Sequence, residues 1–219
     1  MNTCGTAASS SGCASDAGHV MRAGTRTEMV AGPAGNIECA VDTPATEPRG
    51  VALVAHPHPL YGGTLDNKVV QTLARVFVEL GYVAWRPNFR GVGASDGTHD
   101  EGRGEVDDLE AVLLHVKAAK PVLAGFSFGA SVQTRLAQRV SPQRMVLVGA
   151  AVKHLEALPV PADTILIHGE EDSTVPLADV LAWARPQDLP VVVVPGADHF
   201  FHRRLAILRA IVSNNWQRA

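Results

Sequence analysis

From residue 50 onward, short continuous apolar segments alternate with segments whose apolar residues recur at every third or fourth position. A strand reads as a continuous apolar run when both of its faces are buried, as in a parallel sheet covered by helices. Right-handed crossovers between parallel strands then place helices on both faces. The alternation therefore predicts an α/β fold, with strands at VALVAH, YVAWRP, PVLAGF, RMVLVGA, TILIHG and PVVVVPG.

The segments between these strands carry the period of amphipathic helices. Residues 69–80 have apolar side chains on one helical face, and Gly81 follows as a stop signal. Residues 106–116 repeat the pattern between the second and third strands. Further helices are predicted over about 128–140, 177–184 and 200–214.

Two further strands precede the parallel ones. TEMV and NIECAV, separated by the turn residues AGPAG, predict an antiparallel hairpin at one edge of the sheet. The sheet then has eight strands, mostly parallel. Residues 1–22 are rich in Ser, Ala and Gly and predict a weakly ordered tail. The hydrophobic content of 46% over 219 residues favours a single domain over residues 23–219.

Charge, cysteine usage and hydropathy argue against a nucleic-acid-binding, a disulfide-rich and a membrane-spanning protein. The net charge of −3 comes from mixed-sign residues and gives no basic surface for nucleic acid. The three cysteines, Cys4, Cys13 and Cys39, form neither a disulfide framework nor a CxxC pair. No apolar run has the length of a membrane span, and the first twenty residues lack the pattern of a secretory signal. We therefore expect a cytoplasmic protein that binds neither nucleic acid nor membrane.

The segment GFSFG, residues 125–129, lies between a predicted strand and a predicted helix. A serine at such a turn is held in a strained backbone conformation with its hydroxyl pointing outward, and flanking glycines avoid collisions there. GxSxG alone is a weak pattern, so its weight depends on the strand, the helix and suitable partners downstream. Ser127 is the candidate nucleophile.

A serine hydroxyl needs an imidazole to take its proton and a carboxylate to orient that imidazole. Two later strand ends offer both kinds of group, and the carboxyl ends of parallel strands meet at one edge of the sheet. The order serine, acid, histidine is typical of one class of hydrolase. The candidates are Glu170, Glu171 and Asp172 after TILIHG, and Asp198, His199 and His202 after PVVVVPG.

Taken in order, AHPHPLYGGT, RPNFRGVGASDG, GFSFG, HGEEDSTVP and GADHFFH resemble segments of the α/β-hydrolase superfamily. The resemblance runs from about residue 36 to the end and is strongest to small lid-less members related to dienelactone hydrolases. It implies Asp172 as the acid of HGxxDxxVP and His199, which is nearer its strand end than His202, as the base. Dienelactone hydrolases proper use a cysteine nucleophile, whereas this chain has Ser127, so their substrate is not implied.

An acyl-transfer site also needs backbone donors for the oxyanion of the tetrahedral intermediate. The N–H of Phe128, directly after the candidate nucleophile, is one. The resemblance places the other in the segment HPHPL and maps it onto the N–H of His58. Pro57 and Pro59 have no N–H to donate, which leaves Leu60 as the alternative.

Only a short segment, AVKHLEALPVPAD, separates RMVLVGA from TILIHG, where many relatives carry a helical cap. This length leaves no room for a cap, so we expect a site that is open to solvent. The aromatic and apolar residues expected to line it are Leu60, Tyr61, Phe126, Phe128, Phe200 and Phe201.

Two other features have structural rather than catalytic interpretations. His56 and His58 form an HxH pair, but no third ligand occurs at matching spacing, so we expect neither a metal nor a cofactor. The glycine-rich segment after Asn88 lacks a GK[ST] step and predicts a tight loop rather than a phosphate site. Its Arg90 and Asp96 are expected to be structural.

These features predict a serine hydrolase that cleaves small carboxylic esters of short or medium acyl groups through an acyl-enzyme. Thioesterase, peptidase and acyltransferase activities would use the same groups and remain alternatives. A non-catalytic binding protein on the same fold is a further alternative, although no member of the triad is missing. The expected partner is a small molecule with an ester-type bond.

Overall fold

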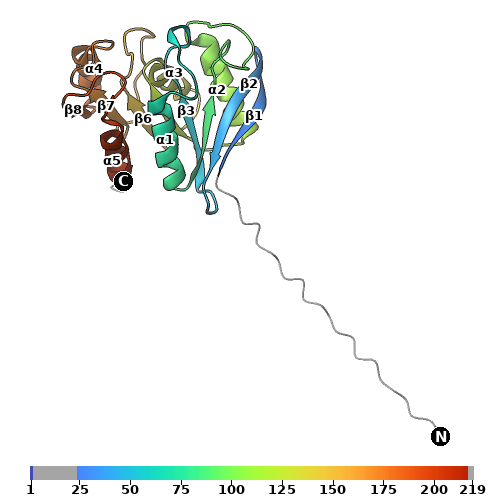
Figure 1. Ribbon diagram of the computed structural model, residues 1–219. Coiled ribbons are helices and arrows are strands. Elements are labelled where there is room, and N and C mark those ends of the chain that lie inside the picture. The colour runs from blue at the N-terminus through green and yellow to red at the C-terminus, as the bar shows by residue number, and fades with distance from the viewer. Residues whose placement is uncertain (2–23, 217–219) are drawn as a thin grey trace.

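The computed structural model describes residue 1 and residues 24–216 of the chain. Its described part contains one eight-stranded sheet with strand order β1-β2-β4-β3-β5-β6-β7-β8 (Figure 1). β2 pairs antiparallel with β1 and β4, and all other neighbouring strands are parallel. The strands are β1 (Gly24–Gly32), β2 (Gly35–Thr43), β3 (Gly50–Ala55), β4 (Tyr82–Pro87), β5 (Val122–Phe126), β6 (Arg144–Val148), β7 (Ile165–Gly169) and β8 (Val191–Val194).

Helices cover both faces of the sheet, and each face has its own apolar core. One core joins the sheet to α2, α3 and α4, and the other joins it to α1 and α5. The helices are α1 (Lys68–Glu79), α2 (Arg103–His115), α3 (Phe128–Leu136), α4 (Leu177–Ala184) and α5 (Leu205–Trp216), with short 3₁₀ turns η1 (Pro59–Tyr61) and η2 (Arg185–Gln187).

The predicted fold class is confirmed, including the hairpin at the sheet edge and the six parallel-type strands. Both hairpin strands are longer than predicted. β1 is an edge strand with mostly exposed side chains, so its sequence does not show the alternation of apolar and polar residues that marks a half-buried strand. The predicted helix over 200–214 was wrong at its start, since α5 begins at Leu205. Phe201 and Arg203 have φ of 55° and 59°, which are incompatible with a right-handed helix. The predicted tail over residues 1–22 lies outside the described residues except for Met1.

The two ends of helix α1 are determined by local sequence signals. The side chain of Asn67 accepts hydrogen bonds from the N–H groups of Val69 and Val70, which caps the first turn. The helix ends before Gly81, whose φ of 90° suits glycine and turns the chain into β4. The apolar face of the helix, Val69 included, is buried against the sheet.

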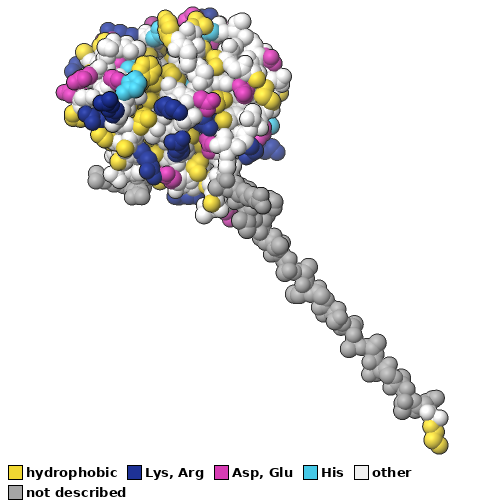
Figure 2. Space-filling view, in the orientation of Figure 1, with side chains coloured by type: hydrophobic (Ala, Val, Ile, Leu, Met, Phe, Trp, Pro, Cys, Tyr) yellow, Lys and Arg dark blue, Asp and Glu magenta, His cyan; other side chains and the backbone are white. Residues whose placement is uncertain are grey.

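The surface shows no dominant charge on the face drawn in Figure 2, where acidic and basic side chains are interspersed with apolar and neutral ones. This distribution agrees with the small net charge of −3. Within the part of the chain that the structure describes, no helix has both the length and the apolar character needed to cross a membrane.

His56, the first residue after β3, ties two loops together at the carboxyl edge of the sheet. Its Nδ1–H donates to the Pro57 carbonyl at 2.6 Å, and its Nε2 accepts the Phe89 N–H at 2.9 Å. The ring is fully buried, and burial lowers its pKa from 6.5 to about 4. The neutral imidazole therefore holds the loop after β3 against the loop after β4.

The lowered pKa of His56 predicts a loss of stability in mild acid. Between pH 6.5 and about 4 the unfolded chain binds a proton at His56 that the folded chain excludes, so stability falls as pH falls. His56 alone should make the protein about 2 kcal/mol less stable at pH 5 than at pH 7. Urea unfolding at both pH values measures this difference.

The variant His56→Gln keeps an acceptor for the Phe89 N–H and has no titratable group at this position. The difference in stability between pH 7 and pH 5 should therefore shrink by about 2 kcal/mol in this variant. An unchanged pH dependence would show that His56 is not the group responsible.

Candidate active site

Ser127 lies in a sharp turn between the end of β5 and the start of α3. Its φ of 54° and ψ of −117° are strained for a residue with a side chain. Neither Gly125 nor Gly129 has room for a Cβ: one on Gly125 would lie 2.6 Å from the Ala130 N, and one on Gly129 would lie 2.4 Å from the His56 O. The glycines of GFSFG are thus required by close backbone approach.

The structure brings the three predicted residues Ser127, Asp172 and His199 together. Ser127 Oγ lies 3.0 Å from His199 Nε2, and His199 Nδ1 lies 2.6 Å from Asp172 Oδ2. All three side chains are buried or nearly so, with Ser127 7% exposed. The chain from hydroxyl through imidazole to carboxylate is continuous, and it is the geometry in which an imidazole can accept the serine proton.

The Asp172 carboxylate is fixed by several donors. Its Oδ1 accepts the N–H groups of Thr174 and Val175 at 2.9 and 2.7 Å. Burial raises the pKa of Asp172, but the hydrogen bond from His199 and that from the Val175 N–H outweigh it, so the net pKa is lowered. His168 lies on the other side, 3.5 Å from Asp172 Oδ2, and its Nε2–H donates to the Val175 carbonyl at 2.9 Å. Asp172 is therefore ionised and held in place.

The rival residues considered for the acid and base are engaged elsewhere. Asp198 Oδ2 pairs with His202 Nδ1 at 2.6 Å, and both side chains are exposed. Glu170 Oε2 accepts the Gly196 N–H at 2.9 Å, and Glu171 is exposed. Asp172 and His199 are the acid and histidine that lie next to Ser127.

The two predicted oxyanion donors differ in their surroundings. The Phe128 N–H opens helix α3 and has no intrahelical acceptor. In the loop after β3, the Leu60 N–H already donates to His58 Nδ1 at 3.3 Å. This bond favours His58 over Leu60 as the source of the second donor, which remains a prediction.

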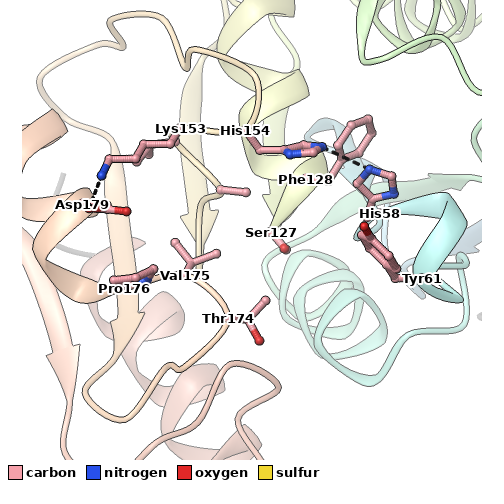
Figure 3. A pocket seen from close by; sticks show the side chains of 12 residues that line it. His58, Tyr61, Ser127, Phe128, Lys153, His154, Thr174, Val175, Pro176 and Asp179 are labelled. Carbon is pink, nitrogen blue, oxygen red and sulfur yellow. Dashed lines mark hydrogen bonds and ion pairs between the residues drawn. The ribbon is translucent and has the colours of Figure 1, made fainter.

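Ser127 faces a cavity of about 400 Å³ at the carboxyl edge of the sheet (Figure 3). Ser127 lies between two walls in this view, one with His58, Tyr61, Phe128 and His154, the other with Thr174, Val175 and Pro176. The complete lining is His58, Tyr61, Ser127, Phe128, Ala151, Val152, Lys153, His154, Thr174, Val175, Pro176 and Asp179.

Only part of the predicted aromatic wall lines this cavity. Tyr61 and Phe128 do, whereas Phe126 and Phe201 are fully buried in the core on the α1 and α5 face. Phe200 is 46% exposed and packs edge-on against the His199 ring, with centroids 5.1 Å apart. Leu60 is exposed but does not line the cavity. Neighbouring residues at a strand end or in a turn can face either the core or the solvent, and the residue type alone does not show which.

The loop between β6 and β7 supplies a wall that sequence analysis did not identify. Four cavity residues, Ala151 to His154, come from it, and Lys153 Nζ pairs with Asp179 Oδ1 at 2.6 Å. His154 Nε2 lies 3.2 Å from His58 Nε2. The sequence indicated only that this loop is short. Its length predicted an open site but did not show which of its residues line the cavity.

The glycine-rich loop after β4 has structural contacts, as predicted. Arg90 forms a two-pronged ion pair with Asp108, at 2.7 and 2.8 Å, and Asp96 Oδ2 accepts the Asn36 N–H at 2.7 Å. Among residue 1 and residues 24–216, no group of three or more His, Cys, Asp or Glu side chains is arranged to hold a metal ion.

Comparisons with known proteins give relatives along most of the chain. A solved structure described as an α/β serine hydrolase without lid, from Xanthomonas campestris, is 35% identical, with a TM-score of 0.83 over 91% of this chain and 96% of its own. An α/β serine hydrolase homologue from Coxiella burnetii is 37% identical, with a TM-score of 0.80 over 87% of this chain and 96% of its own.

An uncharacterized protein of Rickettsia prowazekii (strain Madrid E) is 35% identical over 192 residues, covering 78% of this chain and 79% of the relative. No family model matches the chain. The two solved structures and this relative each match most of their own length.

The turn at Ser127 predicts an unusual effect of Gly129→Ala. Helix propensity alone favours alanine over glycine within a helix by up to about 1 kcal/mol. The collision of a Cβ with the backbone oxygens of Ala55 and His56 should reverse this sign and destabilise the protein by at least about 2 kcal/mol. Thermal unfolding should show a midpoint lowered by about 4 °C or more.

Gly24→Ala serves as the matched control, because a Cβ at Gly24 meets nothing within 4 Å. This variant should unfold at the wild-type temperature. A stabilised Gly129→Ala protein would contradict the close approach of α3 to the end of β3.

Proposed function

The chain belongs to the α/β-hydrolase superfamily, among its lid-less serine hydrolases, and we propose that it hydrolyses small carboxylic esters through an acyl-enzyme on Ser127. The single observation that supports this most directly is the hydrogen-bonded chain from Ser127 Oγ through His199 to Asp172. A serine in this arrangement loses its proton to the imidazole as it attacks a carbonyl carbon.

In the first half of the reaction, Ser127 Oγ bonds to the ester carbonyl carbon and His199 Nε2 takes the hydroxyl proton. Asp172, whose pKa is lowered by the His199 and Val175 hydrogen bonds despite its burial, stays ionised and stabilises the imidazolium. The N–H groups of Phe128 and His58 meet the oxyanion. Collapse of the intermediate breaks the bond to the alcohol, which takes the proton from His199.

In the second half, a water molecule attacks the acyl-enzyme while His199 accepts its proton. The second tetrahedral intermediate collapses, the acid leaves, and His199 returns the proton to Ser127 Oγ. The same residues therefore act twice, and the net reaction is ester plus water giving acid plus alcohol.

The cavity supports a small substrate. Its volume is about 400 Å³, and part of its wall is formed by the short apolar side chains of Val152, Val175 and Pro176. Since the loop between β6 and β7 is short, no cap adds a long apolar tunnel above the site. Short or medium acyl groups are thus the expected substrates, and no observation favours thioester, amide or acyl-transfer chemistry.

Replacing the nucleophile tests the proposal. Ser127→Ala should abolish hydrolysis of nitrophenyl acetate and labelling by a fluorophosphonate, because it removes the hydroxyl that lies next to His199 Nε2. The loss relative to wild type should be about 10³-fold or more in kcat. Stopped assays with purified protein and gel-based labelling measure both effects.

The matched control is Ser131→Ala, at a buried serine in α3 whose hydroxyl has no hydrogen-bond partner among the described residues. It should retain activity and labelling. If Ser127→Ala hydrolyses the ester at the wild-type rate, the proposed function is wrong.

The short aliphatic wall predicts an acyl-chain preference. Values of kcat/KM for nitrophenyl acetate and butyrate should exceed the value for nitrophenyl decanoate by about tenfold or more, since a long chain cannot be accommodated without leaving apolar surface in water. The comparison uses monomeric substrate below its critical micelle concentration. A preference for decanoate would contradict the small-substrate proposal.

A further inference from the structure

Two histidines from different loops meet in the wall of the cavity that Ser127 faces. His58 belongs to the loop after β3 and His154 to the loop between β6 and β7, 96 positions later. Their Nε2 atoms are 3.2 Å apart, and Figure 3 shows the two rings pointing toward each other across the cavity wall. Neither side chain has a place in the hydrolytic steps described above.

The contacts of His58 fix which nitrogen carries its proton. Its Nδ1 accepts the Leu60 N–H at 3.3 Å and is therefore unprotonated in the neutral ring. The proton must then be on Nε2, which donates to His154 Nε2. His154 in turn carries its own proton on Nδ1. The pair is one ordered hydrogen bond between two neutral imidazoles.

The His58 ring is also packed against the residue that follows the nucleophile. Its centroid lies 4.8 Å from that of Phe128 and 4.7 Å from that of Tyr61. Phe128 and His58 are the residues whose N–H groups are the proposed oxyanion donors. The His58 ring thus contacts Phe128 and Tyr61 and is hydrogen-bonded to His154, so its orientation depends in part on a residue of the β6–β7 loop.

We propose that His154 is a positioning residue, which accepts a hydrogen bond from the His58 side chain and thereby holds the His58 N–H in place for the oxyanion. The inference rests on the proposed function and deepens it. A small displacement of an oxyanion donor weakens transition-state binding far more than it weakens substrate binding. His154 therefore acts on kcat rather than on KM.

Both hydrogen bonds of His58 are made by its neutral ring, because a protonated ring could not accept the Leu60 N–H at Nδ1. Burial, His99 and His154 lower the pKa of His58, while Glu101 and Glu105 oppose this, so the net direction favours the neutral ring. His99 is the other imidazole packed on His58, with centroids 4.8 Å apart.

Two substitutions of His154 separate the hydrogen bond from simple packing. His154→Gln places a carbonyl oxygen near the position of Nε2 and should keep kcat within about twofold of wild type. His154→Phe keeps a ring of similar size without an acceptor and should lower kcat by about 10- to 100-fold, with KM changed by less than about threefold. Kinetics with nitrophenyl acetate at pH 8 measure both parameters.

Glu156→Gln is the matched control, since Glu156 is an exposed residue of the same β6–β7 loop and does not line the cavity. Exposed substitutions of this kind change stability little. This variant should keep kcat within about twofold of wild type. Unfolding midpoints of all variants show whether each one is folded at the assay temperature.

The tautomer of His58 gives a further readout. Nuclear magnetic resonance of the ring nitrogens at pH 8 should show His58 in the Nε2–H form in wild type. Wild-type kcat in folded His154→Phe, or an Nδ1–H form of His58, would overturn the inference.

Failure of this inference is distinguishable from failure of the proposed function. If Ser127→Ala is inactive and His154→Phe is fully active, only the positioning role is wrong. If Ser127→Ala is active, the hydrolytic mechanism itself is wrong, and the positioning role is overturned with it.

Discussion

The strained turn at Ser127 depends on how closely helix α3 approaches the end of β3. Gly129 lies so near the carbonyl oxygens of Ala55 and His56 that a Cβ would collide with both. This contact brings the N-terminus of α3, with the Phe128 N–H, beside the loop that carries His58. Ser127 and the two proposed oxyanion donors therefore all depend on this one backbone contact, which the surrounding helices and strands keep fixed.

Buried neutral histidines are a second feature that stabilises the loops at the carboxyl edge of the sheet. His56 binds the loop after β4 and His168 binds the carbonyl of Val175 in the acid loop, and burial lowers the pKa of both rings. The neutral imidazole of His56 uses one donor and one acceptor, so it joins two loops without burying a charge. The buried charge beside His168 is Asp172, which is compensated by the N–H groups of Thr174 and Val175.

The sequence was sufficient to predict the fold, and the residues that it indicated as nucleophile, acid and base lie together in the structure, because each depends on a local pattern at a strand end. It was insufficient for the cavity wall. Phe126 and Phe200 are both aromatic residues near strand ends, yet one lies under the His199 ring in the core and the other is half exposed. Which side of a turn faces the cavity depends on backbone angles such as the φ of 55° at Phe201, and these follow from tertiary packing rather than from residue type. His154 was missed for the same reason, since its partner is 96 positions away.

The short β6–β7 loop takes the place of a cap, and its contacts make it a rigid wall. Arg135 of α3 donates through Nε to the Leu155 carbonyl at 3.0 Å, and Trp183 of α4 donates through Nε1 to the Ala157 carbonyl at 2.8 Å. The Leu158 N–H donates to Thr134 Oγ1 at 3.0 Å. Helices on either side of the loop therefore fix its backbone just after His154. A wall fixed in this way leaves the site open to solvent while keeping His154 Nε2 beside His58, so preorganisation of the proposed oxyanion donors does not require a closing lid.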